Sequence, residues 1–146
     1  MAEATSSDRH YDLEALLEAQ RAYFRDGSTR PIGFRQERLR GFANQLEKRA
    51  DDLLSALAAD LGKPGIEAYV SEVWFTLEET RLFAKQLPKW AKPQRVGNPF
   101  FYWPARSEIR REPFGNSVVI GPWNYPVQLS LSPLIASVGA GNTVVL

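Results

Sequence analysis

The chain has 146 residues, of which 44% are hydrophobic and 24% are charged, as in an ordinary soluble globular protein. Its formal net charge of +1 gives no overall field that would favour nucleic acid or an acidic partner. It contains no cysteine and a single histidine, His10, so the sequence excludes a disulfide, a thiolate nucleophile within these residues and a metal site built on histidine and cysteine.

The first ten residues, MAEATSSDRH, are polar, and we expect them to be disordered. They lack the apolar stretch of a secretory signal. No apolar run approaches the roughly 18 residues that a membrane span requires. The cytosol is therefore the compartment that the sequence indicates.

Apolar residues at helical spacing predict amphipathic helices over residues 11–25, 34–49, 51–61 and about 66–87. The break between the second and third helices is indicated by Asp51 and Asp52, because acidic residues favour a first helical turn. Pro88 is expected to end the last of these helices. The acidic pairs in that helix are interpreted as a solvated surface, and they are Glu67, Glu72, Glu78 and Glu79.

Residues 89–111 combine basic side chains with aromatic ones, and three prolines exclude a regular helix there. The aromatic residues are Phe100, Phe101, Tyr102 and Trp103. This pattern is compatible with contact to nucleic acid or to a membrane surface. We favour an extended arm that packs its aromatics on the helices and leaves its charges in water. On that interpretation no nucleic-acid partner is expected, and membrane contact stays open without further support.

The last third of the chain predicts a strand, a helix and a second strand. Ser117–Ile120 is a β-branched run typical of a strand buried on both faces, and Gly121 and Pro122 end it. A helix opened by Pro126 separates it from a second buried-type strand over residues 143–146. This is a βαβ unit with parallel strands and a right-handed crossover.

A ligand of such a sheet binds beyond the carboxyl ends of its strands, which here means residues 121–124. Asn124 is the best candidate for chemistry there, since its amide offers N–H donors that can stabilise an oxyanion. Alternatively, Asn124 caps the helix that follows it.

The run EPFGNSVVIGPWNYPVQLSLSPLIASVGAGNTVVL, residues 112–146, resembles the aldehyde dehydrogenase superfamily. It is most similar to the class 3 branch, in which a Pro-Trp-Asn-Tyr-Pro element follows the first strand of the NAD-binding domain. Residues 57–64 and 87–90 resemble that branch too, so the resemblance extends from about Leu13 to Leu146. It implies an α/β fold in which a helical lead-in (11–91) and an extended arm (92–115) precede the first βαβ unit (116–146) of a Rossmann-like NAD(P)-binding domain.

The resemblance also implies a function, which is the NAD(P)-dependent oxidation of a small-molecule aldehyde to a carboxylic acid through a cysteine thiohemiacetal and thioester. Asn124 matches the residue of the oxyanion hole. Ile120, Pro122 and Trp123 match positions that face the nicotinamide ribose of NAD or NADP, and Gly121 stands where many members have a bulkier residue. A homodimer is the assembly that the resemblance implies.

The catalytic cysteine and glutamate of that reaction would lie outside these residues, so we expect the 146 residues alone to be inactive. Leu146 falls within a buried-type strand, which suggests a truncated cofactor domain. Two alternatives stay open. One is an acyl-CoA or acyl-phosphate reductase of the same superfamily, and the other is a short non-catalytic chain that dimerises or binds a partner through the arm.

Overall fold

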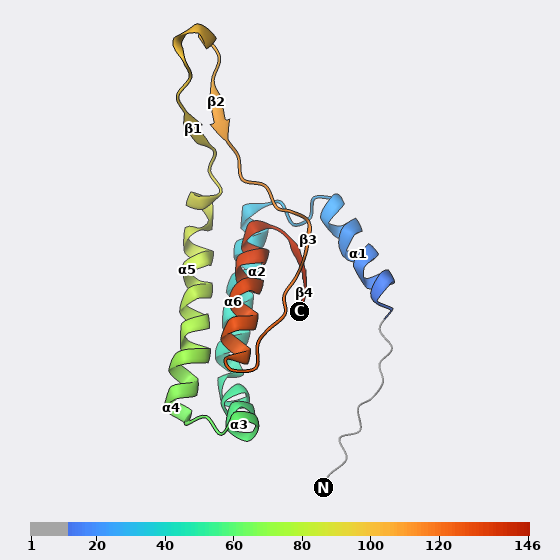
Figure 1. The fold of residues 1–146 in the computed structure, drawn as a ribbon, viewed down its shortest axis with the longest axis vertical. Coiled ribbons are helices and arrows are strands. Elements are labelled where there is room, and N and C mark those ends of the chain that lie inside the picture. Colours follow the sequence, from blue (N-terminus) through green and yellow to red (C-terminus); the bar gives the residue numbers. More distant parts are fainter. Residues whose placement is uncertain (1–11) are drawn as a thin grey trace.

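The computed structural model describes residues 12–146, so the expected disorder of residues 1–10 concerns a part of the chain outside it (Figure 1). In chain order the elements are α1 (Leu13–Arg25), α2 (Ile32–Lys48), α3 (Ala50–Leu61), α4 (Gly65–Ala68), the π-helix η1 (Tyr69–Trp74), α5 (Phe75–Trp90), β1 (Gln94–Val96), the 3₁₀-helix η2 (Phe100–Tyr102), β2 (Ser107–Ile109), β3 (Asn116–Val118), α6 (Pro126–Ala140) and β4 (Thr143–Val145). The predicted restart near Asp51 is confirmed by the boundary between α2 and α3.

The hydrophobic core lies among α2, α5 and α6, which run side by side (Figure 1). Two clusters of buried side chains form it, and their members are Leu39, Ala84, Leu87 and Ile135 in the first and Ala43, Leu46 and Leu77 in the second. Full burial of one leucine or isoleucine contributes about 1.5–3 kcal/mol. This three-helix core contains most of the buried apolar side chains of the described chain. No helix within residues 12–146 has both the length and the apolar character needed to cross a membrane.

The predicted βαβ unit is confirmed, because β3 and β4 are parallel neighbours joined through α6. Their register pairs Asn116 with Thr143 and Val118 with Val145. The two strands contact α6 on one side and α1 on the other (Figure 1). The first helix of the chain therefore covers the sheet that the last residues form.

The first of these strands is less buried than the sequence predicted. Val118 is 66% exposed and Ile120, just past the strand, is 89% exposed. Within residues 12–146 the sheet has only these two strands, and no described element packs over the two side chains. The prediction of burial on both faces is therefore wrong for this part of the chain.

The carboxyl end of α6 is closed by Gly141 and by a long-range arginine. Gly141 adopts the left-handed conformation with φ 99°, which glycine tolerates without strain. The Arg35 guanidinium of α2 donates to the carbonyl oxygens of Gly139 at 3.2 Å and Ala140 at 3.0 Å. These bonds satisfy carbonyls that a helix end leaves unpaired. Partial burial lowers the pKa of Arg35, yet arginine stays protonated in proteins and keeps its donors.

Helix α5 does not end at Pro88 as predicted but continues to Trp90. A proline inside a helix leaves the carbonyl four residues earlier without its donor, and that carbonyl belongs to Ala84. Gln36 of α2 replaces the missing donor through its Nε2, which lies 2.7 Å from the Ala84 oxygen. Trp90 then packs edge to face on Phe83, with ring centroids 5.0 Å apart. These tertiary contacts thus stabilise the helix beyond Pro88.

The extended arm is an antiparallel hairpin of β1 and β2, which projects from the end of α5 away from the helices (Figure 1). The aromatic residues lie at its tip, where Phe100 is 90% exposed and Trp103 is 84% exposed. The rings of Phe101 and Tyr102 contact each other at a tilt of 43°, with centroids 4.7 Å apart. The predicted packing of these aromatics on the helices is wrong, because the hairpin projects away and its tip does not contact the helices.

Candidate functional site

The turn between β3 and α6 brings the predicted site residues together in one segment. Ile120 and Trp123 are 89% and 90% exposed, and Pro122 and Asn124 are exposed as well. The turn lies past the carboxyl end of β3, where parallel sheets bind their ligands. The structure therefore presents three large apolar surfaces and one amide at the position that the sequence predicted for a ligand.

Gly121 fixes one end of this turn against α6. A Cβ atom built on Gly121 would lie 1.8 Å from the Ser130 Oγ and 3.1 Å from the Ser130 Cβ. Non-bonded atoms do not approach each other so closely, so a larger residue here would require the Ser130 hydroxyl to rotate away and its Cβ to shift. The absence of a bulkier side chain at this position thus fits the close approach of Ser130.

Asn124 does not serve as the cap of the following helix. The N-cap of α6 is Tyr125, which makes no side-chain capping hydrogen bond. The alternative in which Asn124 caps the helix is therefore wrong. Its amide is instead carried on the outside of the turn, exposed and one residue before the helix cap.

The cap of α6 comes from Glu72, far away in the sequence. The Glu72 Oε2 accepts from the backbone N–H groups of Val127 at 2.8 Å and Gln128 at 3.1 Å. Its Oε1 accepts from the Lys63 Nζ, which also lies 3.8 Å from the centre of the Tyr125 ring. Glu72 is 0% exposed, so its interpretation as a solvated surface acid is wrong. The reason is that the start of α6 and Lys63 supply the donors that a buried carboxylate needs.

Glu79 was also interpreted as a solvated surface acid, and this is wrong in part. It is partly buried on α5, and its Oε2 accepts from the hydroxyl of Ser132 on α6. Glu67 and Glu78 are exposed, as predicted. Two of the four acids therefore face α6, one at its start and one along its side.

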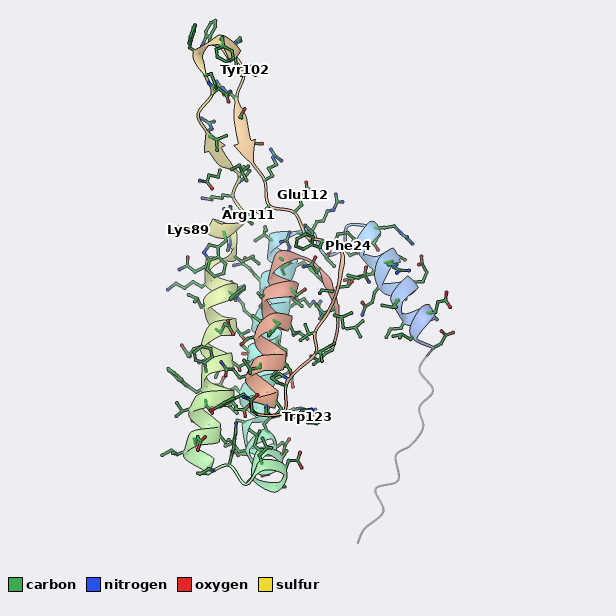
Figure 2. The ribbon with its side chains drawn as sticks, viewed as in Figure 1. Phe24, Lys89, Tyr102, Arg111, Glu112 and Trp123 are labelled. Carbon is green, nitrogen blue, oxygen red and sulfur yellow. The ribbon has the colours of Figure 1, made fainter. Side chains whose placement is uncertain are left out.

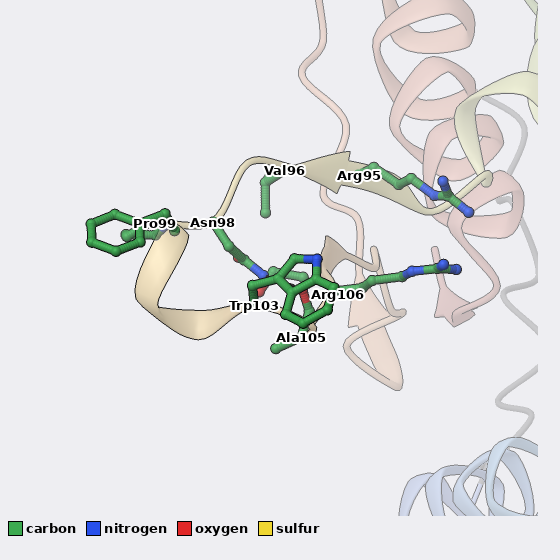
Figure 3. A pocket seen from close by; sticks show the side chains of 9 residues that line it. Arg95, Val96, Asn98, Pro99, Trp103, Ala105 and Arg106 are labelled. Carbon is green, nitrogen blue, oxygen red and sulfur yellow. Dashed lines mark hydrogen bonds between the residues drawn. The ribbon is translucent and has the colours of Figure 1, made fainter.

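A separate hollow of about 290 Å³ lies within the hairpin, away from this turn (Figure 3). The Asn98 Nδ2 donates to the Ala105 carbonyl across it at 2.9 Å, and the Trp103 indole and the Arg95 and Arg106 side chains line it. Figure 2 shows Tyr102 at the hairpin tip, far from Trp123, which lies near the opposite end of the helices. None of the predicted site residues lines this hollow, so we assign it to the hairpin and not to the candidate site.

No group of three or more histidine, cysteine, aspartate or glutamate side chains comes together as a metal site in the described range 12–146. Of the side chains that shape the turn, sequence reasoning missed Lys63 and Glu72. A weak signal for Glu72 was available. It lies four residues from Ala68 and four from Thr76, so small or polar residues recur on one face of the helix.

Comparison with known proteins identifies the family to which the chain belongs. Residues 1–146 match the family described as the aldehyde dehydrogenase family. The chain is 38% identical over 134 residues to the 4,4'-diaponeurosporen-aldehyde dehydrogenase of Staphylococcus aureus, a match that covers 92% of this chain and 29% of that protein. It is 35% identical over 134 residues to the dimeric NADP-preferring aldehyde dehydrogenase of the dog, Canis lupus familiaris, with 92% of this chain and 30% of the relative covered.

Other relatives that are 34–41% identical are named as members of aldehyde dehydrogenase family 3, in agreement with the class 3 resemblance of the sequence. Among solved structures, the substrate-bound state of the Staphylococcus aureus enzyme AldH superimposes with a TM-score of 0.88 at 37% identity, covering 90% of this chain and 29% of that one. The chain thus spans less than a third of the length of these relatives. Because the family match extends over all of its residues, the chain belongs to the aldehyde dehydrogenase family.

Proposed function

We propose that this chain forms the part of an NAD(P)-dependent aldehyde dehydrogenase that carries the oxyanion donor and one wall of the cofactor site. The observation that carries the proposal is the exposed Asn124 amide, held past the end of β3 on a turn that Gly121 and Glu72 fix from either side. The family membership supports it, and so do the names of the relatives in Staphylococcus aureus and the dog.

The role proposed for Asn124 is electrostatic. A cysteine thiolate from polypeptide outside these residues adds to the carbonyl carbon of the aldehyde, and the electron pair of the C=O bond moves to oxygen. The Asn124 Nδ2–H donates to that oxyanion and lowers the barrier to the thiohemiacetal. A thioester then forms and is hydrolysed to the carboxylic acid. Bound NAD(P)⁺ supplies the two-electron acceptor for the hydride lost from carbon.

The cofactor contacts proposed from this chain are Ile120, Pro122 and Trp123, with Gly121 between them. Their exposure beyond β3 leaves this segment open to the nicotinamide ribose, and ligand sites are mostly apolar surfaces with a few polar groups. Gly121 has no side chain that could obstruct this wall. NADP is the preferred cofactor of the dog relative by its name, which supports NADP alongside NAD here.

We also propose that the β1–β2 hairpin takes part in a homodimer of the full-length enzyme. Its aromatic tip is exposed and apolar, and exposed aromatic clusters of this kind mark interaction surfaces. The dog relative is named as dimeric.

The decisive experiment replaces Asn124 by alanine in a full-length enzyme that carries these residues. Loss of one oxyanion donor lowers kcat by about 10²–10³-fold, while the affinity for NAD(P)⁺ stays within about twofold. Asn44→Ala, at an exposed asparagine on α2, serves as the matched control and is expected to leave both values unchanged. Unchanged kcat in Asn124→Ala would refute the oxyanion role.

A further inference from the structure

Glu72 is a fully buried carboxylate that the proposed reaction does not use. It lies in η1, the one π-helical segment of the described chain, at 0% exposure. Its backbone carbonyl accepts from the Thr76 hydroxyl at 2.6 Å, so its main chain is held as well as its side chain. π-Helical turns inside α-helices are found often at functional sites. A buried acid at such a turn requires an explanation beyond packing.

The carboxylate does for α6 what a local N-cap residue does for most helices. The first N–H groups of a helix have no partner within it, and Tyr125 at the N-cap contributes no side-chain bond. The Glu72 Oε2 takes the N–H groups of Val127 and Gln128 instead. An anionic acceptor at a helix start is also favoured by the helix dipole.

Lys63 links the same carboxylate to the turn itself. Its ammonium donates to the Glu72 Oε1 and lies over the Tyr125 ring at 3.8 Å, a distance at which a cation–π attraction acts. The lysine side chain is only 11% exposed, so this contact is poorly screened by water. Tyr125 directly follows Asn124 in the sequence. The Lys63–Glu72 pair therefore contacts the residue next to the proposed oxyanion donor.

We propose that Glu72 is a positioning residue, which together with Lys63 fixes the backbone that presents Asn124 to the substrate. This inference rests on the proposed function of Asn124. Gly121 packed on Ser130 holds the turn at its beginning, and Glu72 on Val127 holds it just past its end. Asn124 lies between these points, so both of them limit where the backbone can carry its amide. A misplacement of about 1 Å at a reacting group can reduce the rate as much as 10²-fold.

The experiment measures Glu72→Gln and Glu72→Asp in the full-length enzyme, alone and combined with Asn124→Ala. Glutamine keeps the shape but removes the anionic acceptor, whereas aspartate keeps the charge but is one methylene too short to reach both N–H groups. We expect either change to lower kcat about 10–100-fold with a nearly unchanged KM for NAD(P)⁺. In the Asn124→Ala background the same changes should cost less than about twofold, since Glu72 acts through Asn124.

Glu79→Gln is the matched control, because Glu79 also bonds α6 but at Ser132, in the middle of the helix. An equal loss of kcat in Glu79→Gln, or equal losses with and without Asn124, would show that Glu72 only supports the fold and would overturn the proposal. Full kcat in Glu72→Asp would overturn it as well, and this variant decides the matter if Glu72→Gln does not fold.

Amide hydrogen exchange separates this proposal from the proposed function. Glu72→Gln should speed exchange at Val127 and Gln128 by about tenfold or more, whereas Glu79→Gln should not. Exchange at these amides could be faster while the wild-type enzyme is inactive or Asn124→Ala has no effect on kcat. That result would refute the oxyanion role, but it would still show that Glu72 caps the start of α6. Unchanged exchange at both amides would show that Glu72 does not hold the start of α6, and it would refute the positioning role.

Discussion

Gly121 has no room for a side chain, and this steric limit has a measurable consequence. Gly121→Ala forces the Ser130 hydroxyl away from the turn and crowds the Ser130 Cβ, since the new Cβ would meet these two atoms at 1.8 Å and 3.1 Å. Overpacking of this kind costs about 1–3 kcal/mol. We expect a lower thermal midpoint and a lower kcat, because α6 and the Asn124 turn separate.

Two further variants control for this effect. Adding Ser130→Ala removes the 1.8 Å contact and leaves a Cβ contact of 3.1 Å, so most of the loss should be recovered. Gly41→Ala lies in α2 with nothing within 4 Å of the new Cβ, and it should stabilise the protein by about 0.5–1 kcal/mol. A double variant as unstable as Gly121→Ala would contradict the steric explanation.

The sequence predicted where Asn124 lies but not what holds it there. A β-branched run that ends in Gly121 and Pro122 marks a strand end by local rules, so the ligand position followed from residues close together in the chain. The burial of Glu72 depends on Lys63 and on the start of α6, which lies 55 residues later. An acidic residue on a helix is usually solvated, and the residues four positions away, Ala68 and Thr76, are too weak a signal to override that expectation.

At the level of elements, helical periodicity predicted the long helical stretch from α4 to α5 and much of its buried face, since Val73, Leu77, Ala84 and Leu87 of the apolar stripe are at most 5% exposed. The prediction failed at the start of the stripe. Ile66 and Val70, on the predicted apolar stripe, are 82% and 52% exposed. The face that contacts the neighbouring helices includes residues spaced by four, and these are Ala68, Glu72, Thr76, Thr80 and Ala84. Small side chains let α6 approach along such a row. The π-helical η1 changes the register within this stretch, which a fixed period of 3.6 cannot anticipate.

The continuation of α5 past Pro88 gives a prediction at the same scale. Gln36→Met keeps the volume of the side chain but leaves the Ala84 carbonyl without its donor, which costs about 1–3 kcal/mol. Amide exchange over residues 84–90 should therefore speed up. In a Pro88→Ala background the main-chain N–H returns to Ala84, so Gln36→Met should cost much less there. Equal costs in both backgrounds would show that Gln36 acts in some other way.

For the whole molecule, the important arrangement is the distance between its two exposed apolar regions. The hairpin tip with Tyr102 and the turn with Trp123 lie at opposite ends of the three-helix core (Figure 2). The packed core of α2, α5 and α6 lies between them. Substitutions at the tip can therefore change assembly without altering the turn directly, so the two proposed roles can be tested separately.

The last prediction concerns the hairpin in the full-length enzyme. Phe100→Ser with Trp103→Ser removes the two most exposed rings of the tip, and loss of aromatic anchors at an interface typically costs 2 kcal/mol or more. We expect the dimer dissociation constant to rise by about 30-fold or more, measured by sedimentation, while Tyr23→Ser on α1 leaves it unchanged. A dimer of unaltered affinity would contradict the assembly role. If the double variant instead loses binding to anionic phospholipid vesicles, the basic and aromatic arm is a membrane contact, which was the alternative left open by its sequence.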